Sequence, residues 1–466
     1  KNPKRTMLRI WRYMKRQKGA LTAAVAFVIL STVLGLIGPY LIGVIVDDHL
    51  MVKDVAGAVR MLAVLAAVYV CAAVCAWLQT LMMVKVALRT IRNLRQDLFD
   101  KLQSLSLRFF DQRTHGDLMS RVTNDIDTLH SALSQSVVQI FSSALMVGGT
   151  AAAMFALNRP LALVTFLVIP LMIFATKTII SYSSGFFKKR QKDLGELNGF
   201  VEEAVTGNEV VALFGKEQSM ERQFSDINER LRRSAVAADM VSGLTGPVNN
   251  FINNLGLGAI IAAGAVMTVQ GTATVGIIAA FVTYSRQFFR PINQFSGLLN
   301  MFQSAVAGAE RVFEIMDEPP DLTDRPGAEE AGTFRGDVEF SHVYFGYEEK
   351  RPVLKNIHFR VNAGETVALV GPTGSGKTTV INLLMRFYDV TSGAVLIDGR
   401  DIRDYKIGSL RKKIGVVLQD TFLFSGTVMD NIRYGRLDAT DEEVIRAAKL
   451  ASAHQFIKHL PEGYQT

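Results

Sequence analysis

The chain has 466 residues, of which 49% are hydrophobic and 20% charged, and it carries a formal net charge of +8. Soluble domains carry about 25% charged residues, so this composition argues against a soluble protein over its whole length. A nucleic-acid partner is excluded as well, because the basic residues border apolar stretches and form no single face with interleaved aromatics. Cys71 and Cys75 share one apolar stretch and are expected to be buried, with no disulfide framework.

Residues 1–18 are strongly basic and carry the aromatic pair Trp11 and Tyr13. This pattern predicts an amphipathic elbow helix lying on the cytoplasmic leaflet of a membrane. No cleavable signal peptide is expected, because the first apolar stretch is too long for the hydrophobic part of one.

Residues 19–316 are predicted to form a six-helix transmembrane domain. A spanning helix needs about 20 mostly apolar residues. Uncharged stretches occur at Gly19–Val46, Met61–Val84, Ser131–Asn158, Leu161–Thr176 and Met240–Ser285. The last is long enough for two spans, divided by a turn at Val269–Gly276. The alternative, six buried helices of a soluble bundle, is disfavoured because such helices rarely stay uncharged on every face.

The connections between the spans predict an orientation. Those at Lys85–His130 and Phe186–Asp239 are long and basic, whereas the alternate ones are short. Cytoplasmic segments carry the excess of Lys and Arg, so both termini are assigned to the cytoplasm of a multi-pass protein, with a bacterial plasma membrane the natural location. Helical periodicity predicts that the spans extend into the cytoplasm, with turns near Gly116 and Gly207.

An acidic stretch with Pro319, Pro320 and Pro326 predicts a linker over residues 317–336. Residues 337–466 have the alternating pattern of an α/β nucleotide-binding domain. Within it, Glu365–Val370 is expected to form a buried strand, and a helix is expected to follow the glycine-rich segment after it.

That glycine-rich segment matches the phosphate-binding loop G-x-x-x-x-G-K-[ST]. Its residues are Gly371, Pro372, Thr373, Gly374, Ser375, Gly376, Lys377, Thr378 and Thr379. The glycines let successive backbone N–H groups approach phosphate oxygens, and the helix N-terminus adds partial positive charge. Lys377 is expected to reach the β- and γ-phosphates of ATP, and the Thr378 hydroxyl is expected to bind Mg²⁺.

The order of six spans, acidic linker and phosphate-loop domain resembles a half-transporter of the ATP-binding cassette (ABC) exporter family, of the multidrug and lipid type. The resemblance is carried by AGAERVFEIMDEPPD, VYFGYEEKRPVLKNIHFRVNAGETVALVGPTGSGKTT and IGVVLQDTFLFSGTVMDNIRYG. It implies that Tyr347 stacks on adenine, the alternative being a core aromatic, and that Gln419 contacts Mg²⁺ and the attacking water. It also implies that Gly116, Asp117 and Gly207 belong to intracellular loops that press on the cassettes.

The family's nucleotide-binding domain continues, beyond the position of Thr466, with the signature, Walker B and switch-histidine motifs. The sequence is therefore expected to hold only the N-terminal part of that domain, with the general base beyond Thr466. The resemblance implies an ATP-hydrolysing translocase in the complete protein, and inefficient hydrolysis by this segment alone. It also implies a second half-transporter, identical or different, because one cassette's signature closes over the other's phosphate loop.

Polar side chains inside the spans are candidates for contact with an amphipathic small-molecule substrate. Asn250 and Asn254 lie four apart in one span, and Arg286 and Arg290 lie four apart in the next. Interhelical hydrogen bonds, snorkelling or carboxylate pairing are their alternative roles. The expected function is ATP-driven export of drug-like compounds or lipids by alternating access. Transport of peptides, lipids or imported substrates, or a nucleotide-sensing regulatory subunit, are the alternatives.

Overall fold

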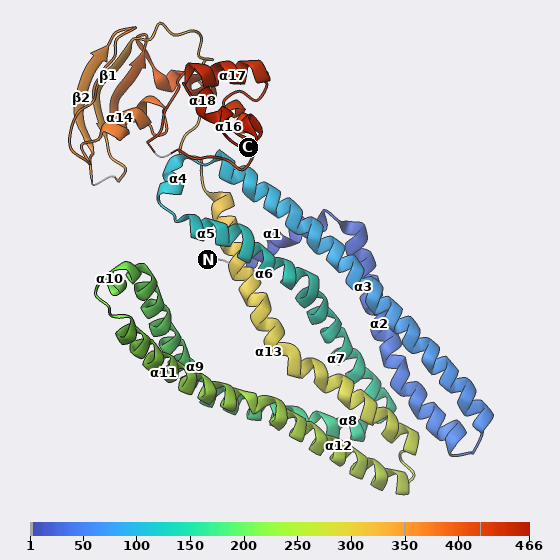
Figure 1. Cartoon of the computed structure of the whole chain (residues 1–466). Helices are drawn as coiled ribbons and strands as arrows, with labels where there is room; N and C mark the ends of the chain where they lie inside the picture. Colours follow the sequence, from blue (N-terminus) through green and yellow to red (C-terminus); the bar gives the residue numbers. More distant parts are fainter. Residues whose placement is uncertain (1–2, 349–350, 420) are drawn as a thin grey trace. The chain divides into compact units, whose positions relative to one another are not determined.

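The computed structural model describes residues 3–348, 351–419 and 421–466, so Lys1 and Asn2 of the predicted elbow helix lie outside it. The chain divides into two compact units. The first unit is Lys1–Leu105 with Phe109–Pro320, and the second is Ser106–Arg108 with Asp321–Thr466. The first is built from long helices, and the second from a small sheet with short helices (Figure 1).

The first unit contains eight long helices among the described residues. They are α1 (Pro3–Lys15), α2 (Lys18–Val44), α3 (Val55–Ser104), α7 (Val137–Leu157), α9 (Val168–Thr206), α11 (Glu217–Gly243), α12 (Thr245–Val269) and α13 (Val275–Asp317). Shorter elements join them: η1 (Ile45–Leu50), α4 (Leu107–Asp111), α5 (His115–Ser120), η2 (Arg121–Asp125), α6 (Ile126–Ser131), η3 (Ala132–Ser136), α8 (Arg159–Phe166) and α10 (Asn208–Leu213). Of these, η1, η2 and η3 are π-helical.

Five helical stretches of the described chain are long and apolar enough to cross a membrane. They are Lys18–Leu50, Val55–Ser104, His115–Leu157, Arg159–Thr206 and Glu217–Val269. These stretches contain the first five predicted spans, and the sixth falls on α13. Large apolar side chains such as Trp77, Phe174 and Val266 are exposed on their surfaces, as a helix in hydrocarbon requires. The first unit is a helical transmembrane domain.

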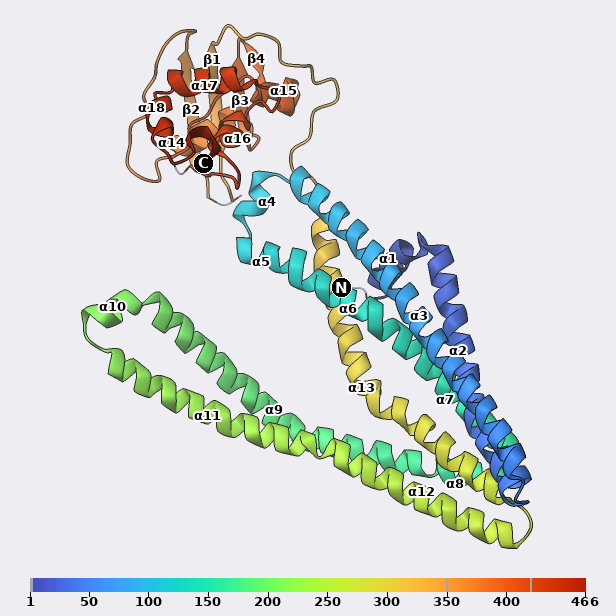
Figure 2. The same cartoon turned by 45° about the vertical axis from the view of Figure 1, so that its right-hand side comes forward.

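Helices α9 and α11 form a long antiparallel pair that runs out from the other helices and is closed by α10 (Figures 1 and 2). Gly207 ends α9, and Gly215, with a φ of 59°, turns the chain toward α11. The other predicted turn falls at residues 112–114, next to Gly116 and not at it. That residue lies in the first turn of α5, because the Thr114 side chain accepts a hydrogen bond from Asp117 N and starts the helix there.

The second unit contains an antiparallel sheet in the order β2-β1-β3-β4. Its strands are β1 (Val338–Phe345), β2 (Leu354–Val361), β3 (Ser392–Ile397) and β4 (Arg400–Asp401), and its helices are α14 (Lys377–Leu384), η4 (Ile402–Asp404) and α15 (Ile407–Arg411). Phe340, Val395 and Leu383 pack in one buried core. This core holds α14, which follows the phosphate loop, against the sheet.

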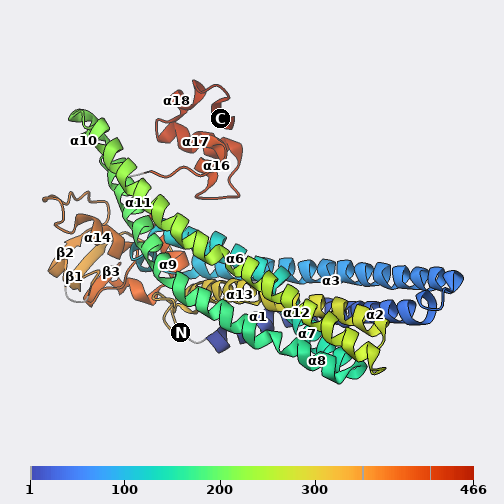
Figure 3. The same cartoon turned by 90° about the horizontal axis from the view of Figure 1, so that it is seen from below.

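A further group of short helices packs together at the end of the chain. It comprises α16 (Val428–Arg433), α17 (Asp441–Leu450), α18 (His454–Lys458) and η5 (Gly463–Gln465). Figure 3 shows it apart from the strands. Thr427 and Thr440 form capping boxes with Asp430 and Glu443, which start α16 and α17.

The buried strand predicted at Glu365–Val370 is wrong for this structure. The segment is irregular, and the side chains of Val367 and Val370 are 52% and 93% exposed. The apolar run before Gln419 is irregular too, with Val417 96% exposed. A strand is stable only when a neighbour satisfies its backbone groups. Neither run has such a neighbour among residues 3–348, 351–419 and 421–466.

Candidate nucleotide-binding site

The predicted phosphate loop leads directly into α14. Gly376 is the N-cap residue of this helix with a φ of 90°, and Gly374 has a φ of 83°. Glycine adopts this left-handed region without the steric cost that a Cβ brings. A Cβ on Gly376 would also lie 2.6 Å from Leu354 Cδ2 on β2. The two glycines therefore stand where the loop has to turn sharply beside the sheet.

The Lys377 side chain folds back over this loop. Its Nζ donates to the carbonyl oxygens of Gly371 at 2.7 Å and Pro372 at 2.9 Å, and lies 3.5 Å from Ser375 Oγ. The ammonium group thus lies beside the N-terminus of α14, where backbone N–H groups and the helix dipole favour an anion. Its present acceptors are neutral, and phosphate oxygens bind an ammonium more strongly.

The two threonines after Lys377 have different surroundings. Thr378 is exposed in the first turn of α14, whereas Thr379 is 4% exposed. The Thr379 hydroxyl lies 3.2 Å from the Tyr347 hydroxyl. Thr378 can therefore offer its hydroxyl oxygen to a hard cation such as Mg²⁺, which prefers oxygen ligands. Thr379 instead joins the loop's helix to Tyr347.

Tyr347 lies beside α14, just after β1. Asn382 Nδ2 donates to its hydroxyl at 3.3 Å. Its ring meets Phe345 and Tyr388 edge-on, with both centroids 5.1 Å away. The residue is half-buried, so it combines core contacts with a partly open ring. A cavity of about 130 Å³ beside it also includes Arg108, but it is smaller than the roughly 300–1,000 Å³ of usual ligand pockets.

Gln419 lies in an exposed bend after the irregular Val416–Leu418 run. The described residues show no contact that joins it to the phosphate loop. The structure therefore brings Tyr347 and the loop together, and leaves Gln419 outside this group.

The predicted intracellular-loop residues lie on short helices. Asp117 in α5 is 3.0 Å from Arg121, and Arg121 reaches Glu314 of α13 at 3.1 Å. A Cβ on Gly116 would meet nothing within 4 Å, whereas one on Gly207 would lie 3.1 Å from the Glu203 carbonyl oxygen. Asp117 is thus linked through Arg121 to the last part of α13.

The polar residues predicted to line a substrate cavity are all exposed. Asn254 Nδ2 donates to Asn250 Oδ1 at 3.3 Å, and both side chains are exposed on α12. Their neighbour Asn249 is buried and bonds Thr176 of α9 at 3.2 Å. Arg286 and Arg290 are exposed on one face of α13. Asn249 therefore joins two helices, whereas Asn250 and Asn254 lie on an exposed face of α12.

Sequence reasoning missed Asn382 as a partner of Tyr347. A signal was present, because Thr379 and Asn382 lie three residues apart on the helix after the loop and so share one face. The spacing does not show that the Tyr347 hydroxyl, just after β1, accepts the hydrogen bond from Asn382.

Residues 21–292 match the family described as ABC transporter transmembrane region, and residues 354–465 match the family described as ABC transporter. The chain belongs to the ABC transporter family. It is an ABC exporter half-transporter, an integral membrane protein with an ATP-binding domain, as the sequence predicted. Its family generally hydrolyses ATP.

Several relatives of this ABC exporter support the assignment. A Bacillus subtilis ABC transporter ATP-binding protein is 43% identical over 100% of this chain and 77% of its own length. A Mycobacterium tuberculosis fatty acid ABC transporter ATP-binding/permease protein is 42% identical over 89% of this chain and 65% of its own. A Syntrophus aciditrophicus ATP-dependent lipid A-core flippase is 34% identical over 96% of this chain and 72% of its own.

A solved structure of a bacterial Atm1-family ABC exporter with ATP bound is also similar. Its TM-score is 0.75 at 28% identity, over 96% of this chain and 79% of that one.

Proposed function

We propose that this ABC exporter uses ATP to move amphipathic small molecules, either drug-like compounds or lipids, across the membrane by alternating access. The observation that carries the proposal is the Lys377 ammonium group, held over the glycine-rich loop at the N-terminus of α14. The relatives named for fatty acids, lipid A-core and multidrug export support an amphipathic cargo.

In this proposal the loop amides and Lys377 bind the β- and γ-phosphates, and Tyr347 stacks on adenine. Thr378 and Gln419 would hold Mg²⁺, whose charge would help to neutralise the phosphate oxygens. The hydroxyl and amide oxygens of these two residues suit that cation. Hydrolysis also needs a general base, and no carboxylate of this chain is assigned to that role.

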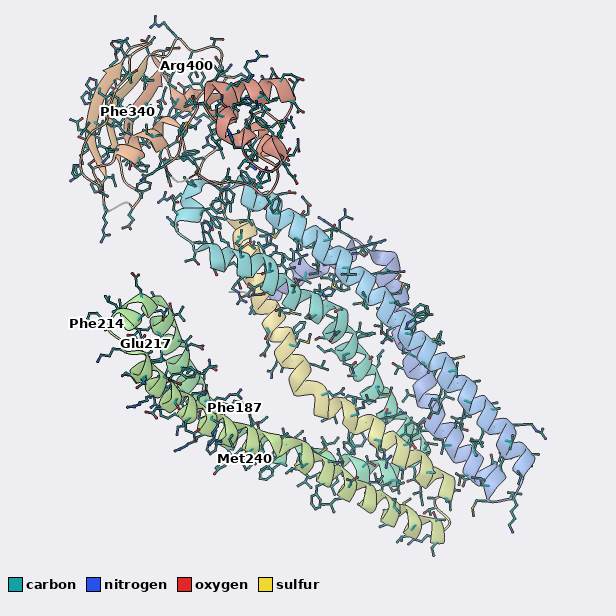
Figure 4. The ribbon with its side chains drawn as sticks, viewed as in Figure 1. Phe187, Phe214, Glu217, Met240, Phe340 and Arg400 are labelled. Carbon is teal, nitrogen blue, oxygen red and sulfur yellow. The ribbon has the colours of Figure 1, made fainter. Side chains whose placement is uncertain are left out.

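A second half-transporter, identical or different, is the proposed partner. The α9–α11 pair and the turn that closes it carry large apolar side chains outside the predicted spans, and Figure 4 labels Phe187 on α9 and Phe214 after α10. Their exposed fractions are 42% and 68%. Exposed apolar side chains that lie together mark interaction surfaces, and Val205, Val210 and Leu213 are exposed beside Phe214. The loop around Gly207 is therefore proposed to press on a cassette, and so is the loop around Asp117. The plasma membrane, with cytoplasmic cassettes, is the proposed location.

Nucleotide binding to the full-length protein in nanodiscs tests the site. Lys377→Ala should weaken ATP binding by about tenfold to a hundredfold, because it removes charge-assisted hydrogen bonds to phosphate. Lys449→Ala is the matched control, since Lys449 is exposed on α17. Equal affinity for ATP in the two variants would contradict the assignment.

A further inference from the structure

An apolar groove of about 460 Å³ runs along α1, between that helix and α6, η3 and α13. Its walls include Met7, Leu8, Trp11, Leu129, Leu133 and Phe302. The volume falls within the roughly 300–1,000 Å³ of sites that hold small molecules. Because carbon atoms line nearly all of it, the groove suits a hydrocarbon chain.

The opposite side of α1 is fastened to the bundle by polar contacts. The Tyr13 hydroxyl donates to Asp97 Oδ2 of α3 at 2.6 Å, and Arg9 Nη1 donates to Asp317 Oδ2 of α13 at 2.6 Å. The Arg9 guanidinium also lies 4.0 Å from the ring centroid of Phe313. Burial, together with Asp97, raises the pKa of Tyr13 to about 12, so this phenol stays a donor at neutral pH. These contacts fix α1 against α3 and α13 and so keep the groove open on its other side.

The groove lies where a bilayer surface is expected. Helix α1 directly precedes Lys18–Leu50, which is apolar enough to span a membrane, so α1 belongs at the depth of the head groups. Leu8 and Trp11 of the groove are 61% and 51% exposed there. The helix carries five basic residues and no acidic one.

Lys4 gives the groove a charged end. It lines the cavity together with Leu8 and Trp11, which follow it at four and seven residues and so lie on the same helix face. An ammonium group beside a hydrocarbon channel matches a molecule with a negative head and a long apolar tail.

We propose that this groove binds one acyl chain of an anionic membrane phospholipid, with its phosphate held by Lys4. A zwitterionic lipid would also fill the channel, but the positive group of its head would offset the attraction of its phosphate for Lys4, whereas an anionic head keeps a net negative charge. A bound lipid would pack between α1 and the last part of α13. This inference does not depend on the proposed cargo or on nucleotide turnover.

The chain's two tryptophans provide a direct test. Trp11 lines the groove, whereas Trp77 is 62% exposed on α3. The full-length protein is placed in phosphatidylcholine bilayers that contain a small fraction of lipid brominated on its acyl chains, which quenches nearby tryptophan. In the Trp77→Phe protein, brominated phosphatidylglycerol should quench Trp11 with about fivefold higher apparent affinity than brominated phosphatidylcholine. In the Trp11→Phe protein, Trp77 should show no such preference.

Two further variants, each in the Trp77→Phe background, distinguish specific lipid binding in the groove from general attraction of anionic lipid to the basic helix α1. Lys4→Gln should abolish the preference at Trp11. Arg12→Gln removes the same charge from the same helix outside the groove, and it should leave the preference intact. A fold control places Lys4→Gln in the Trp11→Phe protein. The quenching of Trp77 by both lipids should not change there if the fold is kept.

Three results would overturn the proposal. Equal quenching of Trp11 by both lipids would show that the groove does not select the anionic head. An equal loss of the preference with Arg12→Gln and with Lys4→Gln would show surface attraction only. Protection of Trp11 from both lipids would show that a second copy of the chain covers the groove.

Discussion

Gly376 combines a left-handed backbone with a close approach to Leu354. Gly376→Ala should therefore destabilise the cassette by about 1–3 kcal/mol and weaken ATP binding, because the loop must leave its present path. Gly408→Ala is the control, since nothing lies within 4 Å of its added Cβ and its φ is not positive. Thermal unfolding and ATP titration of both variants check this prediction. A Gly376→Ala protein that matches Gly408→Ala in both measurements would refute it.

Arg286 and Arg290 present two exposed positive charges on one face of α13. If they attract anionic head groups or substrates, Arg286→Ala/Arg290→Ala should lower the affinity for anionic amphiphiles by about tenfold. The effect is limited because each exposed charge contributes at most about 1 kcal/mol. Affinity for cationic amphiphiles should not fall. Binding of matched anionic and cationic dyes to the full-length protein measures the ratio. An unchanged ratio would remove these residues from the substrate path.

The phosphate loop could be predicted because its chemistry fixes residue types at a fixed spacing, from Gly371 to Thr379. The surroundings of Tyr347 could not, because its contacts with Thr379 and Asn382 join segments about thirty residues apart. The position of Lys377 over the Gly371 and Pro372 carbonyls also depends on how the loop folds, which spacing alone leaves open.

One of the ion pairs between η2 and α13 involves a nearly buried carboxylate. Asp125 is 7% exposed, and Arg311 donates to both of its carboxylate oxygens, with Nε 2.8 Å from Oδ2. Arg311→Ala should cost about 2 kcal/mol of unfolding free energy, because it leaves a nearly buried carboxylate without its charged donor. Thermal unfolding in detergent measures the loss.

The control for this ion pair is an exposed one on α11. Arg232 pairs with Glu229 on the same helix, and both side chains are well exposed. Arg232→Ala should leave the unfolding temperature nearly unchanged, because water screens this exposed pair. If it lowered the unfolding temperature as much as Arg311→Ala, the burial argument would fail.

Helices were easier to predict than strands, for a physical reason. A helix makes its backbone hydrogen bonds within one segment. The charge-free run Gly19–Val46 was therefore enough to predict the helix that the structure shows as α2 and η1. Glu365–Val370 has the composition of a buried strand, but a strand also needs a neighbour. Gly116 failed as a turn because the Thr114 cap places it inside α5. The π-helical segments gave no sequence signal.

Two separately folded units in one chain follow from the composition shift near the acidic linker. The charge-free runs lie in the first compact unit and the phosphate loop lies in the second. Residues from Asp321 onward belong to the second unit, and Arg386 donates to the Thr323 carbonyl at 3.3 Å. That contact could not be foreseen, since a proline-rich acidic stretch reads as a free connector.

ATP-driven export by this protein requires that a nucleotide on the loop drives movement of cargo through the helices. The most direct measurement is ATP-dependent transport of a fluorescent amphiphile by the full-length protein in proteoliposomes, compared between Lys377→Ala and Lys449→Ala. We expect ATP-dependent transport to be lost in Lys377→Ala and retained in Lys449→Ala, because only the first removes the ammonium group at the phosphate loop. Undiminished ATP-dependent transport by Lys377→Ala would contradict the account.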